Sequence, residues 1–138
     1  MFLMFVTTSL FSHENYELNL YEKVLPAIFK KNHLKVYVDE DAKELMRYSS
    51  VFTIVSKCSE ASLLIGAKFN DISTICLHKP LFSTSYKSFK NNHNSFGAFY
   101  WRKSRPQIKF KNKVLKRYNL KLPKSLIRFA KWQKSLIY

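Results

Sequence analysis

Glycine, proline and cysteine are all scarce in this chain of 138 residues. Two glycines and four prolines exclude collagen-like and other glycine- or proline-rich low-complexity classes. The two cysteines are too few for a disulfide scaffold or a four-cysteine zinc site. No apolar run reaches about 18 residues, so no transmembrane helix is expected in the mature chain. A hydrophobic fraction of 46%, with 12 Phe and 8 Tyr, is enough to form a folded core.

Acidic residues are missing from the second half of the sequence. Residues 1–71 contain eight basic and nine acidic residues, a net charge of −1, whereas residues 72–138 contain 16 basic residues and no acidic ones. A segment this basic attracts polyanions such as nucleic acid, anionic lipid headgroups or an acidic protein face. The composition that an AT-rich genome imposes on solvated surfaces would give the same charge without any ligand.

Catalytic motifs are also missing. The sequence contains no GxGxxG, GxxxxGK[ST], GxSxG or HExxH pattern, and its four histidines are scattered. Glu40 and Glu44 share a helix face, which is a common arrangement of solvated acids and does not indicate a general acid and base. We therefore predict a protein that is not an enzyme and that uses no cofactor and no bound metal.

Residues 1–12 predict a signal peptide. Met1 to Phe11 are apolar with small polar interruptions, and Ser12 offers a small residue at a cleavage site. No Lys or Arg precedes this run, which indicates a truncated leader whose start codon lies further upstream; the alternative is a buried N-terminal strand. We expect one α/β domain over residues 13–138, located in the periplasm. In that oxidising compartment Cys58 and Cys76 can form one disulfide, whereas in the cytosol they would be two buried thiols.

Strands and helices alternate along the rest of the sequence. Four runs rich in β-branched and aromatic residues predict strands at 34–38, 51–55, 61–66 and 80–84. Apolar spacing and capping residues predict helices at 15–32, 39–47, about 112–118 and after Pro123, with a short helix or turn at 85–89. This order favours a three-layer α/β fold, in which helices cover both faces of a mainly parallel sheet of about four strands.

Residues 95–111 predict an antiparallel β-hairpin at the edge of that sheet. A four-residue turn over 102–105 would set Trp101 opposite Pro106 and Phe99 opposite Ile108. The side chains then expected to face the core are Phe99, Trp101, Ile108 and Phe110. Those expected to face the other way are Ala98, Tyr100, Gln107 and Lys109.

Three sequence stretches in the second half of the chain, together with the predicted apolar strand at 61–66, follow one another in a recognisable order. They are Lys-Pro-Leu-Phe-Ser-Thr-Ser-Tyr at 79–86, Phe-Gly-Ala-Phe-Tyr-Trp-Arg-Lys-Ser-Arg-Pro-Gln-Ile-Lys-Phe at 96–110, and Leu-Lys-Leu-Pro-Lys-Ser-Leu at 120–126. The order of a strand with a small polar end, a glycine-led hairpin, a helix and a leucine-x-leucine step resembles the end of YfiR-like periplasmic regulators. The resemblance lies mainly within residues 61–132.

This resemblance implies an exported, non-enzymatic domain. Members of that family bind the periplasmic part of a membrane diguanylate cyclase or sensor and hold it inactive, and the redox state of cysteines can tune this. By position, Cys58 and Cys76 would be the pair concerned. This chain is shorter than typical members and its second half is far more basic, so the partner of this chain is not identified by the resemblance.

The predicted partner surface lies on and beside the hairpin turn, because aromatic and Arg side chains dominate binding energy at interfaces. Its candidate residues are Tyr100, Arg102, Lys103, Arg105 and Gln107. In the alternative interpretation these residues are only a solvated turn next to the core. Two other functions compete with the regulator: a basic cytoplasmic nucleic-acid-binding protein, for which no known motif is present, and a receptor resembling one lobe of a solute-binding protein.

Overall fold

Six strands form one sheet in the order β2-β1-β3-β4-β5-β6 in the computed structural model, which describes residues 2–69 and 74–127. The first five pair in parallel, and β6 pairs antiparallel with β5. The strands are β1 (Leu34–Val38), β2 (Phe52–Ile54), β3 (Leu63–Gly66), β4 (Leu81–Ser83), β5 (Ser95–Arg102) and β6 (Arg105–Phe110). Strands β1 to β4 lie within the four segments predicted as strands, and β5 and β6 lie within the predicted hairpin. The mainly parallel α/β class with a C-terminal hairpin is thus confirmed.

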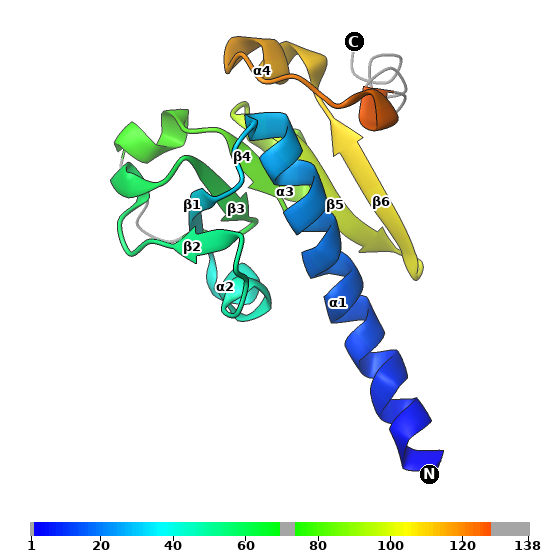
Figure 1. Ribbon diagram of the computed structural model, residues 1–138. Coiled ribbons are helices and arrows are strands. Elements are labelled where there is room, and N and C mark those ends of the chain that lie inside the picture. Colours follow the sequence, from blue (N-terminus) through cyan, green and yellow to red (C-terminus); the bar gives the residue numbers. More distant parts are fainter. Residues whose placement is uncertain (1, 70–73, 128–138) are drawn as a thin grey trace.

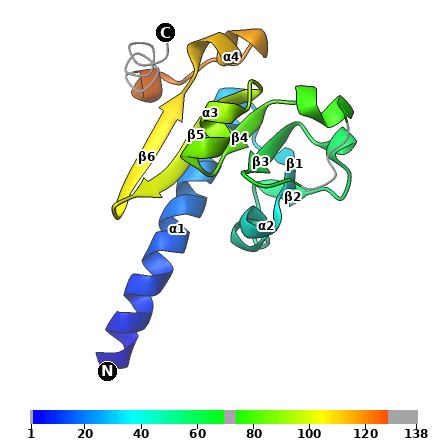
Figure 2. The same ribbon diagram turned by 180° about the vertical axis from the view of Figure 1, so that it is seen from behind.

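Helices cover both faces of the sheet. They are α1 (Phe2–Phe29), α2 (Glu40–Met46), α3 (Tyr86–Asn91) and α4 (Asn112–Arg117), with 3-10 turns η1 (Cys58–Glu60), η2 (Thr74–His78) and η3 (Lys124–Leu126). Helices α1, α2 and α4 contribute to the larger core on one face, and α3 packs on the opposite face, as the two views show (Figure 1, Figure 2). The predicted helix after Pro123 lies mostly outside the described residues.

Helix α1 begins earlier than the sequence predicted. Its predicted start was residue 15, but the helix is continuous from Phe2 and ends at Phe29, with Pro26 inside its last turn. The alternative of a buried N-terminal strand is therefore wrong. Lys30 has a φ of 55°, a left-handed conformation that commonly ends helices. The prediction missed the first half of the helix because residues 2–11, which are apolar apart from Thr7, Thr8 and Ser9, show no helical periodicity.

The larger core lies between α1 and the sheet and is rich in aromatic rings. Tyr21 of α1 meets Phe82 and Phe99 edge-on, with ring centroids 5.6 and 5.8 Å apart. The ring of Phe82 also lies 5.7 Å from that of Phe96, so two strands, β4 and β5, and one helix share this cluster. Burial of Tyr21 raises the pKa of its phenol, and the nearby Glu17 carboxylate acts in the same direction.

Asp39 ties α2 to the loop that follows β3. As the N-cap of α2, it accepts a hydrogen bond at Oδ1 from the Ala42 amide at 2.9 Å. Its Oδ2 accepts hydrogen bonds from the amides of Ala67 and Lys68 at 2.8 and 3.0 Å. Gly66 leaves room for this carboxylate, since a Cβ at that position would lie 2.6 Å from Asp39 Cγ. The sequence predicted a capping acid within residues 39–41, and the structure assigns this role to Asp39; its bonds to Ala67 and Lys68 were not predicted.

Strands β5 and β6 keep the predicted register around a shorter turn. Trp101 pairs with Pro106, as expected, and Arg102 pairs with Arg105. The four-residue turn was wrong, because only Lys103 and Ser104 separate the strands, with φ values of 50° and 65°. Two consecutive left-handed residues are typical of a type I′ turn, whose twist matches that of the flanking strands. Each strand is one residue longer at the turn than predicted, so the pairs of opposed residues are the same as those predicted.

Pro106 stands at a position of β6 where it interrupts no hydrogen bond to β5. The Lys111 amide donates a hydrogen bond to the Phe96 carbonyl, so residues 96 and 111 form a hydrogen-bonded pair. Hydrogen-bonded and non-hydrogen-bonded pairs alternate along an antiparallel ladder. In this register Trp101 and Pro106 therefore form a non-hydrogen-bonded pair. The nitrogen of Pro106 therefore points away from β5, on the outer side of the last strand of the sheet.

Replacing Asp39 with Ala should lower the free energy of unfolding by roughly 3 kcal/mol, because it removes a helix cap and leaves two amides without their charged acceptor. Urea denaturation followed by circular dichroism measures this loss. Asp41→Ala is the matched control, since Asp41 is an exposed acid in the first turn of the same helix. A loss for Asp39→Ala no larger than that of the control would contradict the structural role of Asp39.

The raised pKa of Tyr21 predicts a loss of stability at high pH. The unfolded chain releases this phenolic proton near pH 10, before the folded protein does, so the contribution is complete below that value and lost as the pH rises. The free energy of unfolding should fall by up to about 1.4 kcal/mol per pH unit above pH 10 from this group. Tyr21→Phe lacks the ionisable group, so above pH 10 the free energy of unfolding of the wild type should fall relative to that of the variant by this slope. A difference that is constant with pH would refute the assignment.

Candidate partner-binding site

The residues predicted to bind a partner gather on one face of the β5–β6 hairpin. Tyr100 is paired with Gln107 and Arg102 with Arg105, and directly opposed residues point to the same side of a sheet. Lys103 occupies the turn itself. Together with Tyr86 and Lys109, which are described next, these side chains form what we call the hairpin surface: Tyr86, Tyr100, Arg102, Lys103, Arg105, Gln107 and Lys109.

Helix α3 adds Tyr86, which the sequence did not single out. Ser85 caps this helix by accepting a hydrogen bond from the Ser88 amide at 3.1 Å. The capped helix places the Tyr86 ring 5.8 Å from that of Tyr100. Tyr86 is 48% exposed, whereas Tyr100 is only 9% exposed. Tyr100 was expected to offer an exposed ring, but it supports Tyr86 from below, because α3 packs on this face of the hairpin.

Buried hydroxyl groups hold α3 against the sheet. Ser83 and Ser95, on the neighbouring strands β4 and β5, are joined through their Oγ atoms at 2.7 Å. Ser88 of α3 donates from its Oγ to Ser83 Oγ at 3.0 Å. A buried network of this kind restricts the position of the helix, because any shift would leave polar groups without partners. Tyr86 therefore projects from a fixed support.

Lys109 of β6 completes the surface. Its Nζ lies 5.0 Å from the ring centroid of Tyr86 and 5.9 Å from that of Tyr100, within the range of cation–π attraction. In the described part of the chain, the only ion pair within 4.0 Å joins Arg47 to Glu44. The cations of the hairpin surface thus have no carboxylate of the described chain at ion-pair distance.

An open groove of about 490 Å³ lies at the end of the hairpin surface. Its lining consists of hydroxyl groups, aromatic rings and one guanidinium, from Thr84, Ser85, Tyr86, Tyr100, Trp101 and Arg102. The Trp101 indole donates a hydrogen bond to Glu17 of α1, so this wall of the groove is fixed to the body. Such a lining suits a carboxylate or aromatic side chain of a partner, which the guanidinium and the rings can bind.

The crevice at which doubly wound sheets usually bind ligands is filled in this protein. That crevice lies at the carboxyl ends of the strands where the strand order reverses, here between β1 and β3. Asp39, directly after β1, accepts hydrogen bonds from the two amides that follow β3. The protein's own carboxylate occupies the position that a bound anion would take.

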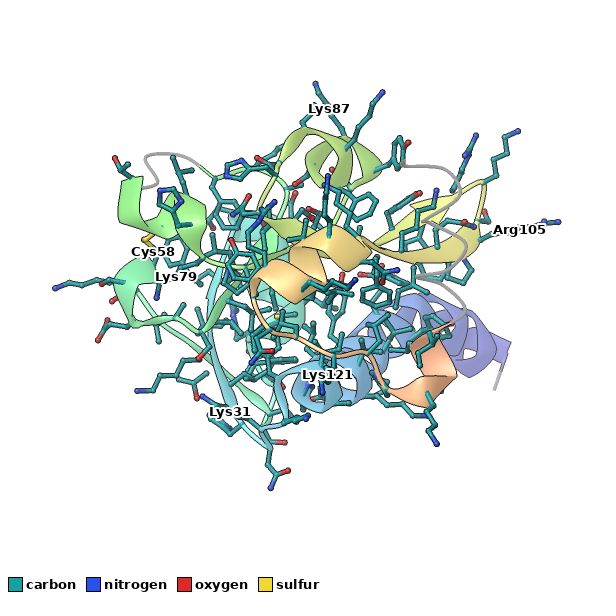
Figure 3. The ribbon with its side chains drawn as sticks, turned by 90° about the horizontal axis from the view of Figure 1, so that it is seen from above. Lys31, Cys58, Lys79, Lys87, Arg105 and Lys121 are labelled. Atoms are coloured by element: carbon teal, nitrogen blue, oxygen red, sulfur yellow. A yellow bond between two sulfur atoms is a disulfide. The ribbon has the colours of Figure 1, made fainter. Side chains whose placement is uncertain are left out.

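Cys58 and Cys76 form a disulfide that joins η1 to η2, with their Cα atoms 5.9 Å apart. The Nζ of Lys79 donates to the Ser59 carbonyl at 2.9 Å and to the Ala61 carbonyl, which ties the same corner. Figure 3 shows Cys58 and Arg105 on opposite sides of the molecule, so the disulfide does not belong to the hairpin surface.

Neither a cluster of metal ligands nor a membrane-spanning helix is found among the described residues. No three His, Cys, Asp or Glu side chains among them lie close enough together to hold a metal ion. None of the helices within residues 2–69 and 74–127 combines the length and the apolar character needed to span a bilayer.

Comparisons with known proteins inform the fold alone. No family model matches the chain, and no curated protein matches it. A solved structure, that of a conserved domain protein from Vibrio cholerae O1 biovar El Tor, aligns with a TM-score of 0.50 and 9% sequence identity. The alignment covers 85% of this chain and 58% of the Vibrio protein. At this identity the match indicates a similar fold and says nothing about function.

Arg105→Glu should stabilise the protein slightly while removing a cation from the hairpin surface. Arg102 and Arg105 are directly opposed like charges, and an Arg–Glu pair in their place should raise the free energy of unfolding by about 0.5 kcal/mol. Arg105→Gln is the control, since it removes the repulsion without adding attraction and should give a smaller gain. Thermal denaturation at low salt measures the change in stability of both variants. A loss of stability in Arg105→Glu would mean that Arg105 has a structural role.

Proposed function

We propose that this protein is an exported, non-enzymatic binding module whose hairpin surface docks on the periplasmic part of a membrane signalling protein, a diguanylate cyclase or a sensor kinase. The observation that carries this proposal is the Tyr86–Tyr100 ring pair, bridged by Lys109 and flanked by two arginines without carboxylate partners in the described chain. Rings and guanidinium groups supply most of the binding energy at interfaces. The stretches 79–86 and 96–110, which resemble YfiR-like regulators, build this same surface.

The charge of the hairpin surface defines the partner's chemistry. Arg102, Lys103 and Arg105 are exposed at the turn, and Lys109 lies further along β6 against the two tyrosine rings, so the complementary face should be acidic. Complementary charges raise the association rate and set the orientation of docking, while the exposed Tyr86 ring and the groove beside it would hold an inserted side chain.

The disulfide supports a periplasmic location, because such bonds persist in oxidising compartments and are rare in the cytosol. The predicted signal peptide is compatible with the fold. Tyr16 contacts the rings of Phe99 and Trp101, and Glu17 accepts a hydrogen bond from Trp101. These contacts lie beyond residue 12, so cleavage after Ser12 would retain them.

Photo-crosslinking in cells of the native host tests the proposal. A benzophenone side chain at position 86 should form a light-dependent adduct with a membrane protein that has a periplasmic domain, and Arg105→Glu should abolish it. The matched control is the same group at position 48, since Tyr48 is also an exposed tyrosine but lies after α2, away from the hairpin. Mass spectrometry identifies the adduct. Equal labelling from both positions, or labelling of cytosolic proteins or nucleic acid alone, would reject the proposed function.

A further inference from the structure

A second cationic surface lies on α4, apart from the hairpin surface. Val114 and Leu115 face the core, while Lys113, Lys116 and Arg117 are exposed on the outer side of the helix. Figure 3 looks down on α4, and Lys87 and Lys121 lie on either side of it in this view. The fold thus directs several cations to one end of the molecule.

Hydrogen bonds fix α4 to the loop between α3 and β5. Arg117 donates from its guanidinium to the His93 carbonyl at 2.8 Å. Lys111, just before α4, donates from Nζ to the Asn92 carbonyl at 3.1 Å and to the Phe89 carbonyl. The exposed Lys90 lies in the last turn of α3, directly before this loop, so it belongs to the segment to which α4 is bonded. The cations are therefore carried by one rigid support.

No acidic residue of this region balances these charges. Residues 74–127 contain 13 Lys and Arg and no Asp or Glu. The electrostatic effect is visible at the half-buried Lys111, whose pKa is lowered by burial and by the positive charge of Arg117. A bound anion would relieve this repulsion, which makes the surface suited to a multiply charged ligand.

An exposed aliphatic side chain borders the cations. Leu77 of η2 is 44% exposed, and the neighbouring His78 carbonyl accepts a hydrogen bond from the Tyr118 hydroxyl at 2.8 Å. Tyr118 follows α4 directly, so Leu77 lies at the border of the same end of the molecule. We name Leu77, Lys90, Lys113, Lys116 and Arg117 the α4 surface.

We propose that the α4 surface binds the anionic headgroups of a phospholipid bilayer. Each cation near such a bilayer is attracted to the phosphates, and an exposed leucine can enter the boundary between headgroups and acyl chains. This inference goes beyond the proposed function and does not depend on it. If both hold, the bilayer contact would keep the protein at the membrane that contains its partner.

The chemistry of the α4 surface favours lipid over nucleic acid. Single-stranded nucleic acid is held by stacking of bases on exposed rings. Tyr118, the aromatic residue next to α4, packs against the larger core instead, and its hydroxyl is bonded. Helix α4 has only six residues and lies on the body with two apolar residues buried, which does not suit insertion into a major groove.

Vesicle sedimentation with the disulfide-bonded full chain tests the inference. The protein should sediment with vesicles that contain phosphatidylglycerol, not with pure phosphatidylcholine vesicles, and binding should weaken as salt increases. The triple variant Lys90→Gln, Lys113→Gln, Lys116→Gln should bind roughly 100-fold more weakly, from about fivefold per charge. These three lysines have no side-chain hydrogen bond among those found in the described residues, so the variant should fold normally.

A second triple variant distinguishes the α4 surface from total charge. Lys23→Gln, Lys43→Gln, Lys57→Gln has the same net charge, and these exposed lysines lie on α1, on α2 and before η1. It should retain binding within a few-fold of wild type, because screened charges far from the bilayer contribute little. An equal loss in both triple variants would overturn the assignment to the α4 surface.

The variant Leu77→Asn distinguishes binding to an anionic bilayer from binding to nucleic acid. It should weaken vesicle binding several-fold and leave binding to a single-stranded oligonucleotide unchanged, since only a bilayer accepts the aliphatic side chain. An oligonucleotide that binds more tightly than vesicles at equal phosphate concentration, and loses binding in the Lys90, Lys113 and Lys116 triple variant, would overturn the lipid assignment. Because the vesicles contain no protein, their result is independent of the crosslinking from position 86.

Discussion

The carboxylate of Asp39 is the interaction on which the central part of the fold depends. It caps α2, which leads from β1 to β2, and it binds the backbone that leaves β3 on the other side of β1. One side chain therefore holds the point where the chain changes its direction across the sheet. The same carboxylate fills the usual ligand crevice, so the binding proposed above uses side chains on the outer surfaces, where the second half of the sequence places its rings and cations.

The parts of the fold that depend on local patterns could be predicted from the sequence. The predicted turn had the correct centre, between Lys103 and Ser104, so the predicted pairing of Phe99 with Ile108 and of Trp101 with Pro106 was correct although the turn length was wrong. A turn shortened symmetrically by one residue on each side leaves every opposed pair unchanged. The cap of α2 was likewise visible, because a capping acid acts within four residues of its own position.

Features that depend on contacts between distant segments could not be predicted. Nothing near Asp39 in the sequence indicates its bonds to Ala67 and Lys68, which are 28 and 29 residues away. The burial of Tyr100 depends on where α3 packs, and the importance of Tyr86 follows only once it lies over Tyr100. For the candidate site, the sequence therefore identified the strand residues and their common face, and missed the helix that covers part of it.

Pro106 has a consequence for how this sheet can meet other proteins. A strand that joined β6 from outside would need amide donors along that edge, and the one at position 106 does not exist. Continuous extension of the sheet, whether by another copy of the chain or by an extended peptide, is interrupted beside the hairpin turn. Edge-to-edge pairing of copies is thus opposed by the backbone itself at this end of the molecule, while contacts made by side chains above the sheet are not affected.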